Sequence, residues 1–150
     1  MAIKRHSSLQ EFSKDHQQAL LLCWKIKVGL SKGIALERIK AYVDWFYKNH
    51  IVTHFLLEEK YMFPVLGSEH SLIIRAMEEH KVLLALFERN SEIDKSLQQL
   101  HLKLKEHIRF EERVLFNEIQ SVATKDQLII IEKFHNNEKF IDNINDVFWK

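Results

Sequence analysis

The sequence predicts an all-α protein: a four-helix bundle followed by an additional C-terminal helical segment. The 150 residues include only three glycines and one proline, so few positions oppose helix formation. Apolar residues recur at three- and four-residue steps along four long segments, as expected for helices with one buried face. Similar patterns appear in both halves of the chain, which indicates two helical hairpins packed together.

The first two helices are expected over residues 8–30 and 35–63. His16 falls within the apolar stripe of the first helix, one turn beyond Phe12. Pro64 ends the second helix, because proline has no N–H to donate and its ring clashes with the preceding turn. The inward stripe of the second helix is predicted to be Ile39, Val43, Phe46, His50, His54, Leu57, Glu58 and Tyr61.

The third and fourth helices are expected over residues 69–89 and 92–121. Ser68 is a candidate N-cap for the third helix, and Ser91-x-x-Asp94 resembles a capping box at the start of the fourth. The inward stripe of the third helix is predicted to be Ile73, Met77, His80, Leu84 and Phe87. That of the fourth is predicted to be Ile93, Leu97, Leu100, Leu104, His107, Glu111, Val114 and Glu118.

Residues 124–149 are expected to add one or two helices that cover an open side of the bundle. Thr124-x-x-Gln127 fits the capping-box pattern and opens this segment. Its apolar residues are Leu128, Ile131, Phe134, Ile141, Ile144 and Phe148. We therefore expect a single domain over residues 1–150, with the bundle at about 8–121 and the extension at about 124–149.

One motif occurs twice, as His54-x-x-x-Glu58-Glu59 and as His107-x-x-x-Glu111-Glu112. Residues four apart lie on one face of a helix, so each copy directs an imidazole and a carboxylate to one place. The helix that precedes each copy carries a weaker repeat, Asp15-His16 in the first half and Glu79-His80 in the second. The four predicted helices therefore each present a His to the interior.

These side chains form a candidate metal centre. Four imidazoles and two carboxylates would be costly to bury without a cation, because a buried charge needs a partner. If the carboxylates bridge two metals, each metal also receives two nitrogens and keeps positions for solvent and a small ligand. This donor set suits non-haem iron, with manganese and zinc as alternatives. The predicted ligands are His16, His54, Glu58, His80, His107 and Glu111.

Other polar residues are expected around this centre. His50 lies two turns before Glu58, about 12 Å along the helix axis, so we expect it to line the pocket instead of binding metal. Glu59 and Glu112 are expected on solvated or salt-bridged flanks. Asp15 and Glu79 either orient an imidazole or lie at the surface. The His residues expected to be bystanders are His6, His70, His101 and His135.

Composition restricts the partners. A net charge of +1 gives no electrostatic basis for binding nucleic acid or an anionic membrane, and no apolar run approaches the length of a membrane span. The single cysteine excludes an internal disulfide and favours a cytoplasmic location. Apolar residues near the predicted ligands favour a small neutral ligand such as dioxygen or nitric oxide. They are Phe12, Phe46, Leu57, Tyr61, Phe110 and Val114.

Together these motifs resemble the hemerythrin-like, or HHE cation-binding, family, over about residues 6–118. The resemblance implies an up-and-down four-helix bundle around a non-haem, carboxylate-bridged pair of iron ions. It implies the same six ligands. The family's members bind dioxygen reversibly, sense oxygen or iron, or handle iron and reactive oxygen and nitrogen species.

The chain departs from the oxygen carriers of that family at two ligand positions. Ala76 stands one turn before His80, where those carriers have a His. Glu111 follows His107 by four residues, where they have an Asp five residues after the His. The expected function is binding of dioxygen or a related small ligand, for storage or sensing. A di-iron enzyme acting on peroxide or nitric oxide, and an iron-holding or iron-sensing module, stay open as alternatives.

Overall fold

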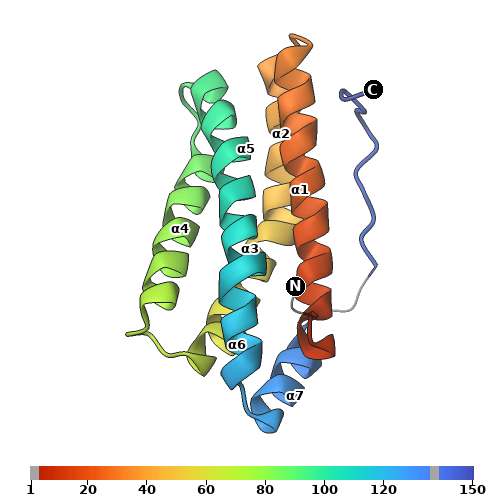
Figure 1. Ribbon diagram of the computed structural model, residues 1–150. Coiled ribbons are helices and arrows are strands. Elements are labelled where there is room, and N and C mark those ends of the chain that lie inside the picture. Colours follow the sequence, from red (N-terminus) through yellow and green to blue (C-terminus); the bar gives the residue numbers. More distant parts are fainter. Residues whose placement is uncertain (1–3, 136–138) are drawn as a thin grey trace.

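The computed structural model describes residues 4–135 and 139–150, and over these residues it contains helices and no strands. Four long helical units pack side by side, as Figure 1 shows. The first unit is η1 (Ser7–Leu9) with α1 (Gln10–Ser31). The second comprises α2 (Leu36–Phe46), η2 (Tyr47–Ile51), α3 (Val52–Leu57), η3 (Glu58–Met62) and η4 (Phe63–Val65), and the third is α4 (Ser71–Glu88). The fourth comprises α5 (Ile93–Phe110), η5 (Glu111–Leu115) and α6 (Phe116–Val122), and it is followed by α7 (Lys125–Phe134).

The predicted up-and-down bundle is confirmed, and a polar layer divides its core in two. One apolar layer lies near the η4 end of the bundle and includes Phe12, Met62, Ala76 and Phe116. The other lies towards the opposite end and is built from residues such as Ala19, Phe55, Leu83 and Leu104. Each unit passes from one layer to the other near its predicted metal ligands, and successive units do so in opposite directions.

Three segments of π-helix shift the register of the inward faces. They are η2, η3 and η5, and each lies inside a long unit. A π-helical turn holds an extra residue, so the inward positions beyond it move by one. Beyond Glu111, the first residue of η5, the buried residues are Leu115, Phe116 and Ile119, whereas Val114 is 45% exposed and Glu118 is also exposed. The predicted stripe was therefore wrong beyond Glu111.

The helix ends differ in part from expectation. The capping box of Thr124 and Gln127 is confirmed, since each side chain bonds to the backbone of the other residue. The third unit is capped by His70, whose Nδ1 accepts from the backbone N–H of Leu72, and Ser68 does not cap it. The capping box expected at Ser91 is absent: the N-cap of α5 is Glu92, with φ 49° and no side-chain bond.

The C-terminal extension contributes one helix and a non-helical segment to the described residues. Residues 139–150 run beside α1 in Figure 1. Phe148 is buried against Ile39 and Gly29, but Ile141 and Ile144 are 78% and 73% exposed, so the prediction that they cover the bundle was wrong. Among the described helices, none is both long and apolar enough to cross a membrane.

Two ion pairs fasten this segment to the bundle. Lys25 of α1 is buried and donates to Asp142 over 2.6 Å and to the hydroxyl of Tyr42 over 2.8 Å. Near the end of the chain, Arg38 of α2 pairs with Asp146 over 2.7 Å. The segment is therefore held along its length by both charge and apolar packing.

Candidate metal centre

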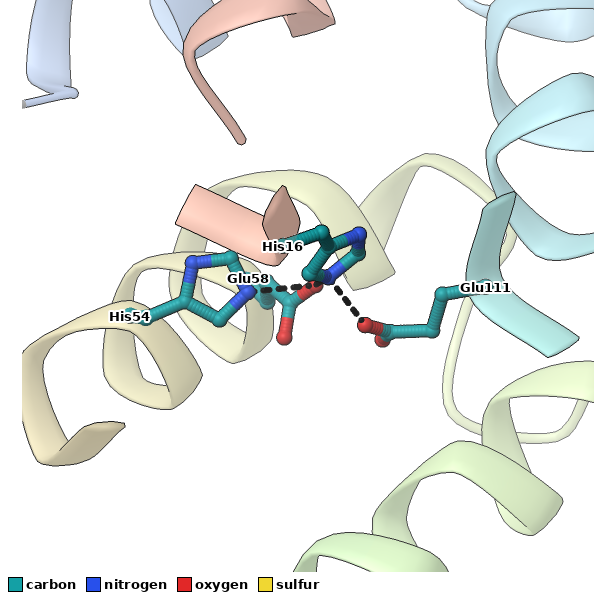
Figure 2. A group of neighbouring side chains, drawn as sticks. All are labelled: His16, His54, Glu58 and Glu111. Carbon is teal, nitrogen blue, oxygen red and sulfur yellow. Dashed lines mark hydrogen bonds and ion pairs between the residues drawn. The ribbon is translucent and has the colours of Figure 1, made fainter. Parts of the chain in front are cut away.

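The structure brings all six predicted ligands together in the polar layer. Their exposed fractions lie between 0% and 7%, and they come from all four helical units. They form two groups, each with ligand atoms within 4.8 Å of one another. The first group is His16, His54, Glu58 and Glu111, whose side chains point toward one another in Figure 2. The second group is Glu58, His80, His107 and Glu111.

Both carboxylates belong to both groups. Glu58 places its two oxygens 3.3 Å from Nε2 of His54 and 3.2 Å from Nε2 of His80. Glu111 Oε1 lies 3.0 Å from Nε2 of His16 and 3.3 Å from Nε2 of His107. Each carboxylate thus lies between one imidazole of each group, which is the arrangement that bridging ligands need.

An outer carboxylate contacts Nδ1 of every imidazole. A carboxylate only accepts hydrogen bonds, so each Nδ1 carries a proton, and Nε2 is left facing the centre as the atom that can bind a metal once it is deprotonated. This is how metal-binding imidazoles are usually oriented in proteins. The four contacts are His16 to Glu112 at 2.7 Å, His54 to Asp15 at 2.9 Å, His80 to Glu59 at 2.7 Å and His107 to Glu79 at 2.7 Å.

The structure shows which imidazole each outer carboxylate contacts. Asp15 and Glu79 do orient imidazoles, but each serves the ring of a neighbouring helix instead of the His that follows it in sequence. Glu59 and Glu112, expected on solvated or salt-bridged flanks, also hold rings from other helices. Sequence spacing did not reveal these pairs, because they depend on how the helices pack.

Aromatic rings restrict two of the imidazoles further. Phe55 stacks on His80 with 3.8 Å between ring centroids and 4° between planes. Phe116 stacks on His16 with centroids 5.0 Å apart. Rings held by a hydrogen bond on one edge and by packing on one face lose little further freedom when they bind an ion.

Several buried atoms that face the centre have no hydrogen-bond partner among residues 4–135 and 139–150. A buried polar atom without a partner costs about 1–3 kcal/mol, so a group of them at one place calls for a missing ligand. A metal ion would satisfy them together, and the residues present therefore fit a metal. The atoms are Nε2 of His54, His80 and His107, both oxygens of Glu58, and Oε2 of Glu111.

Charge within the centre shifts the pKa values of its members. Burial by itself lowers the pKa of His54, but the charge of Glu58 and the hydrogen bond to Asp15 raise it to about 9. Burial and the charge of Glu111 act to raise the pKa of Glu58, and the neighbouring imidazoles outweigh them and bring it to about 2. Without a metal, protons on the imidazoles therefore balance the carboxylates, and a metal must displace them.

A cavity of about 130 Å³ adjoins the centre. His16, His54 and His107 line it on one side, and Phe46, Phe55, Leu104 and Ile108 contribute apolar walls. As expected, His50 lines this cavity and belongs to neither ligand group. Its ring packs against Phe46 and Phe140, and burial lowers its pKa. Of the predicted apolar wall, Phe46 and Leu57 line the cavity, whereas Val114 faces solvent.

The expected bystander histidines have different roles. His6 and His70 cap helical segments through Nδ1, as local structural residues do. His101 is buried in α5 outside both ligand groups. His135 was misjudged: it is 8% exposed, and its Nε2 lies 2.8 Å from Oδ2 of Asp15. No sequence pattern pointed to it, because the partners lie 120 residues apart.

The fold and the site together define a helical bundle built to hold metal cations through His and Glu side chains. Comparison with protein families gives a match to the hemerythrin HHE cation-binding domain over residues 7–119. The chain belongs to this family, as its motifs suggested. Neither the curated proteins nor the solved structures give a match.

Proposed function

We propose that this chain is a non-haem di-iron protein that binds dioxygen or a related small ligand, for storage, delivery or sensing. In this proposal His16 and His54 hold one ion, His80 and His107 hold the other, and Glu58 and Glu111 bridge them. The main support is that both carboxylates are shared between the two four-residue groups. Imidazole and carboxylate donors suit non-haem iron, and manganese and zinc are the competing metals.

The charges around the centre favour two divalent ions. Six carboxylates surround the four imidazoles, two inside and four outside. Arg75 pairs with Glu79 over 2.8 Å, and Arg5 lies 3.6 Å from Glu112. Two charges from each ion and one from each guanidinium balance the six carboxylates when the imidazoles are neutral. With a single ion, protons retained on the imidazoles would have to supply the remaining positive charge.

The cavity supports a small ligand. The imidazoles and carboxylates of the two groups would hold the metal beside this cavity, and bound iron would supply redox chemistry there. Phe46, Phe55 and Leu104 give this space apolar walls beside its polar side chains. His50, whose pKa is lowered, offers a neutral hydrogen-bonding group at the cavity. A space of about 130 Å³ with both apolar walls and hydrogen-bonding groups suits dioxygen, peroxide or nitric oxide.

One observation favours an enzyme as the second candidate. Ala76, which takes the place of a further His of the oxygen carriers, is fully buried and belongs to the apolar layer below the centre. The chain thus offers no ligand at that position, and an ion there has more room for exchange. Turnover of peroxide or nitric oxide is the activity this arrangement suits. An iron-holding or iron-sensing module would use the same ligands without turnover.

Elemental analysis and absorption spectroscopy test the proposal. Protein purified from iron-supplied cells is expected to contain two irons per chain and to show a charge-transfer band that changes on reduction. A reversible change on cycling dioxygen supports ligand binding, whereas rapid consumption of peroxide or nitric oxide supports the enzyme. Protein that takes up no iron, or prefers zinc or manganese when all three are supplied, would refute the di-iron assignment.

A further inference from the structure

The C-terminal segment reaches the metal centre through one side chain. His135 follows α7, lies beyond the residues matched by the family domain, and is 8% exposed. Its Nε2 lies 2.8 Å from Oδ2 of Asp15, and the same oxygen lies 2.9 Å from Nδ1 of His54. Because a carboxylate only accepts, both rings donate to this one oxygen. The edge of the His135 ring also packs on Phe12, with centroids 4.5 Å apart.

The opposite half of the centre shows what such a contact does. Asp15 and Glu79 hold equivalent places in the internal repeat, and each bonds Nδ1 of an imidazole on a neighbouring helix. Glu79 is fixed by Arg75, one turn earlier on the same helix, over 2.8 Å. In the first half the residue four before Asp15 is Glu11, which pairs with Lys14 instead. His135 thus supplies to Asp15, from a distant part of the chain, the support that Arg75 gives to Glu79.

Asp15 needs this support more than a buried carboxylate would. Its side chain is 39% exposed, so water competes for its oxygens. Two donors, His135 and His54, meet at its Oδ2. A carboxylate fixed by two donors has one position, and the ring that donates to it has one orientation.

We propose that His135 is a positioning residue of the metal centre, which fixes the ring of His54 through the carboxylate of Asp15. The segment that follows the family domain thereby controls how tightly one of the two metal positions is held. This inference rests on the proposed function. It makes the two positions unequal, because the His80–His107 position receives no such contact from the described part of that segment.

Two substitutions separate the hydrogen bond from simple packing. His135→Phe keeps an aromatic ring against Phe12 and removes the donor. His135→Gln keeps an N–H group near the place of Nε2 and loses the ring. A positioning role predicts that the Gln variant behaves like the wild type and the Phe variant does not. A packing role predicts the reverse.

Release of Fe²⁺ to a chelator is the first readout. Losing a group that orients a metal ligand typically costs 10- to 100-fold in affinity. His135 acts one step further out, so we expect His135→Phe to release one of two irons about 10-fold faster, with the other unchanged. Arg75→Met is the matched control and should affect the other iron, through Glu79 and His107. Equal acceleration of both irons in His135→Phe, or none, would overturn the proposal.

The second readout needs no metal. In the metal-free protein the Nδ1–H proton of His54 should give a downfield NMR signal, because it donates to a carboxylate and its ring is buried. His135→Phe should speed its exchange with solvent, while the signal of His107 stays unchanged and His135→Gln resembles the wild type. An unaltered His54 signal in His135→Phe would show that the ring is fixed without His135. If the wild type binds no iron, the proposed function fails, and this signal still decides the role of His135.

Discussion

Glu58→Gln provides the sharpest test of the metal centre. Glu58 is fully buried and is one of the two residues shared by both ligand groups. A Gln side chain has nearly the same size and shape, so the substitution changes mainly the charge. An amide cannot bridge two cations as a carboxylate does, so this change should abolish both metal positions. His54→Ala removes a ligand from one group and should reduce metal content less.

The size of the effect follows from linkage. A metal present at 100 to 1,000 times its dissociation constant stabilises the native state by about 2.7–4.1 kcal/mol. For a domain of this length, 1 kcal/mol shifts the melting temperature by about 2–4 °C. Removing the metal should therefore lower the melting temperature of the wild type by about 5–16 °C. Glu58→Gln should lack this increment whether or not metal is supplied.

Metal content and thermal unfolding, each measured with and without chelator, check this reasoning. Glu118→Gln is the matched control. Glu118 is exposed on α6, so this variant should keep the metal content and the melting temperature of the wild type. If Glu58→Gln kept full metal occupancy, or if chelator destabilised it as much as the wild type, Glu58 would not be a shared ligand.

Three further predictions concern packing, the C-terminal segment and pH. Gly29→Ala would place a methyl group 2.7 Å from Phe148, so denaturant unfolding should show a loss of about 1–3 kcal/mol. Lys25→Met removes the buried donor to Asp142, and limited proteolysis should then cut the C-terminal segment faster than in the wild type. Metal affinity should rise with pH from 6 to about 9, because the pKa of His54 is raised to about 9 and a metal must displace the proton that His54 holds below that pH. Calorimetry in two buffers should record the release of this proton.

Each of these predictions has a contrary result. Unchanged unfolding in Gly29→Ala would mean that Phe148 is not packed against α1 as described. Equal cleavage rates in Lys25→Met would mean that the ion pair does not hold the segment. Metal affinity that is flat over this pH range would show that the imidazoles are not protonated in the metal-free protein, contrary to the raised pKa values.

The inner ligands could be predicted because their signal is local. His54 with Glu58, and His107 with Glu111, are each four residues apart, and helix geometry alone places both members on one face. The bundle followed from the same periodicity. Up to Glu111, the inward face of the fourth helix was correctly read.

The rest required the packed structure. A π-helical turn adds one residue without a distinct local signature, so nothing in the sequence showed that Val114 would turn outward and Leu115 inward. The outer carboxylates bond to rings on other helices, and their partners depend on helix rotation and offset. His135 reaches Asp15 only after the chain has passed α7, which no periodicity can anticipate.

The polar layer also has a consequence for folding. The polar layer separates the two apolar layers of the core. Without metal ions, protons shared between its imidazoles and carboxylates hold this layer together, in place of close apolar contact. The half that contains α7 and η4 has fewer buried residues and should open first when ions are withdrawn. The supply of metal would then govern which end of the molecule becomes exposed to proteases, and the turnover of the polypeptide itself would follow the availability of its metal.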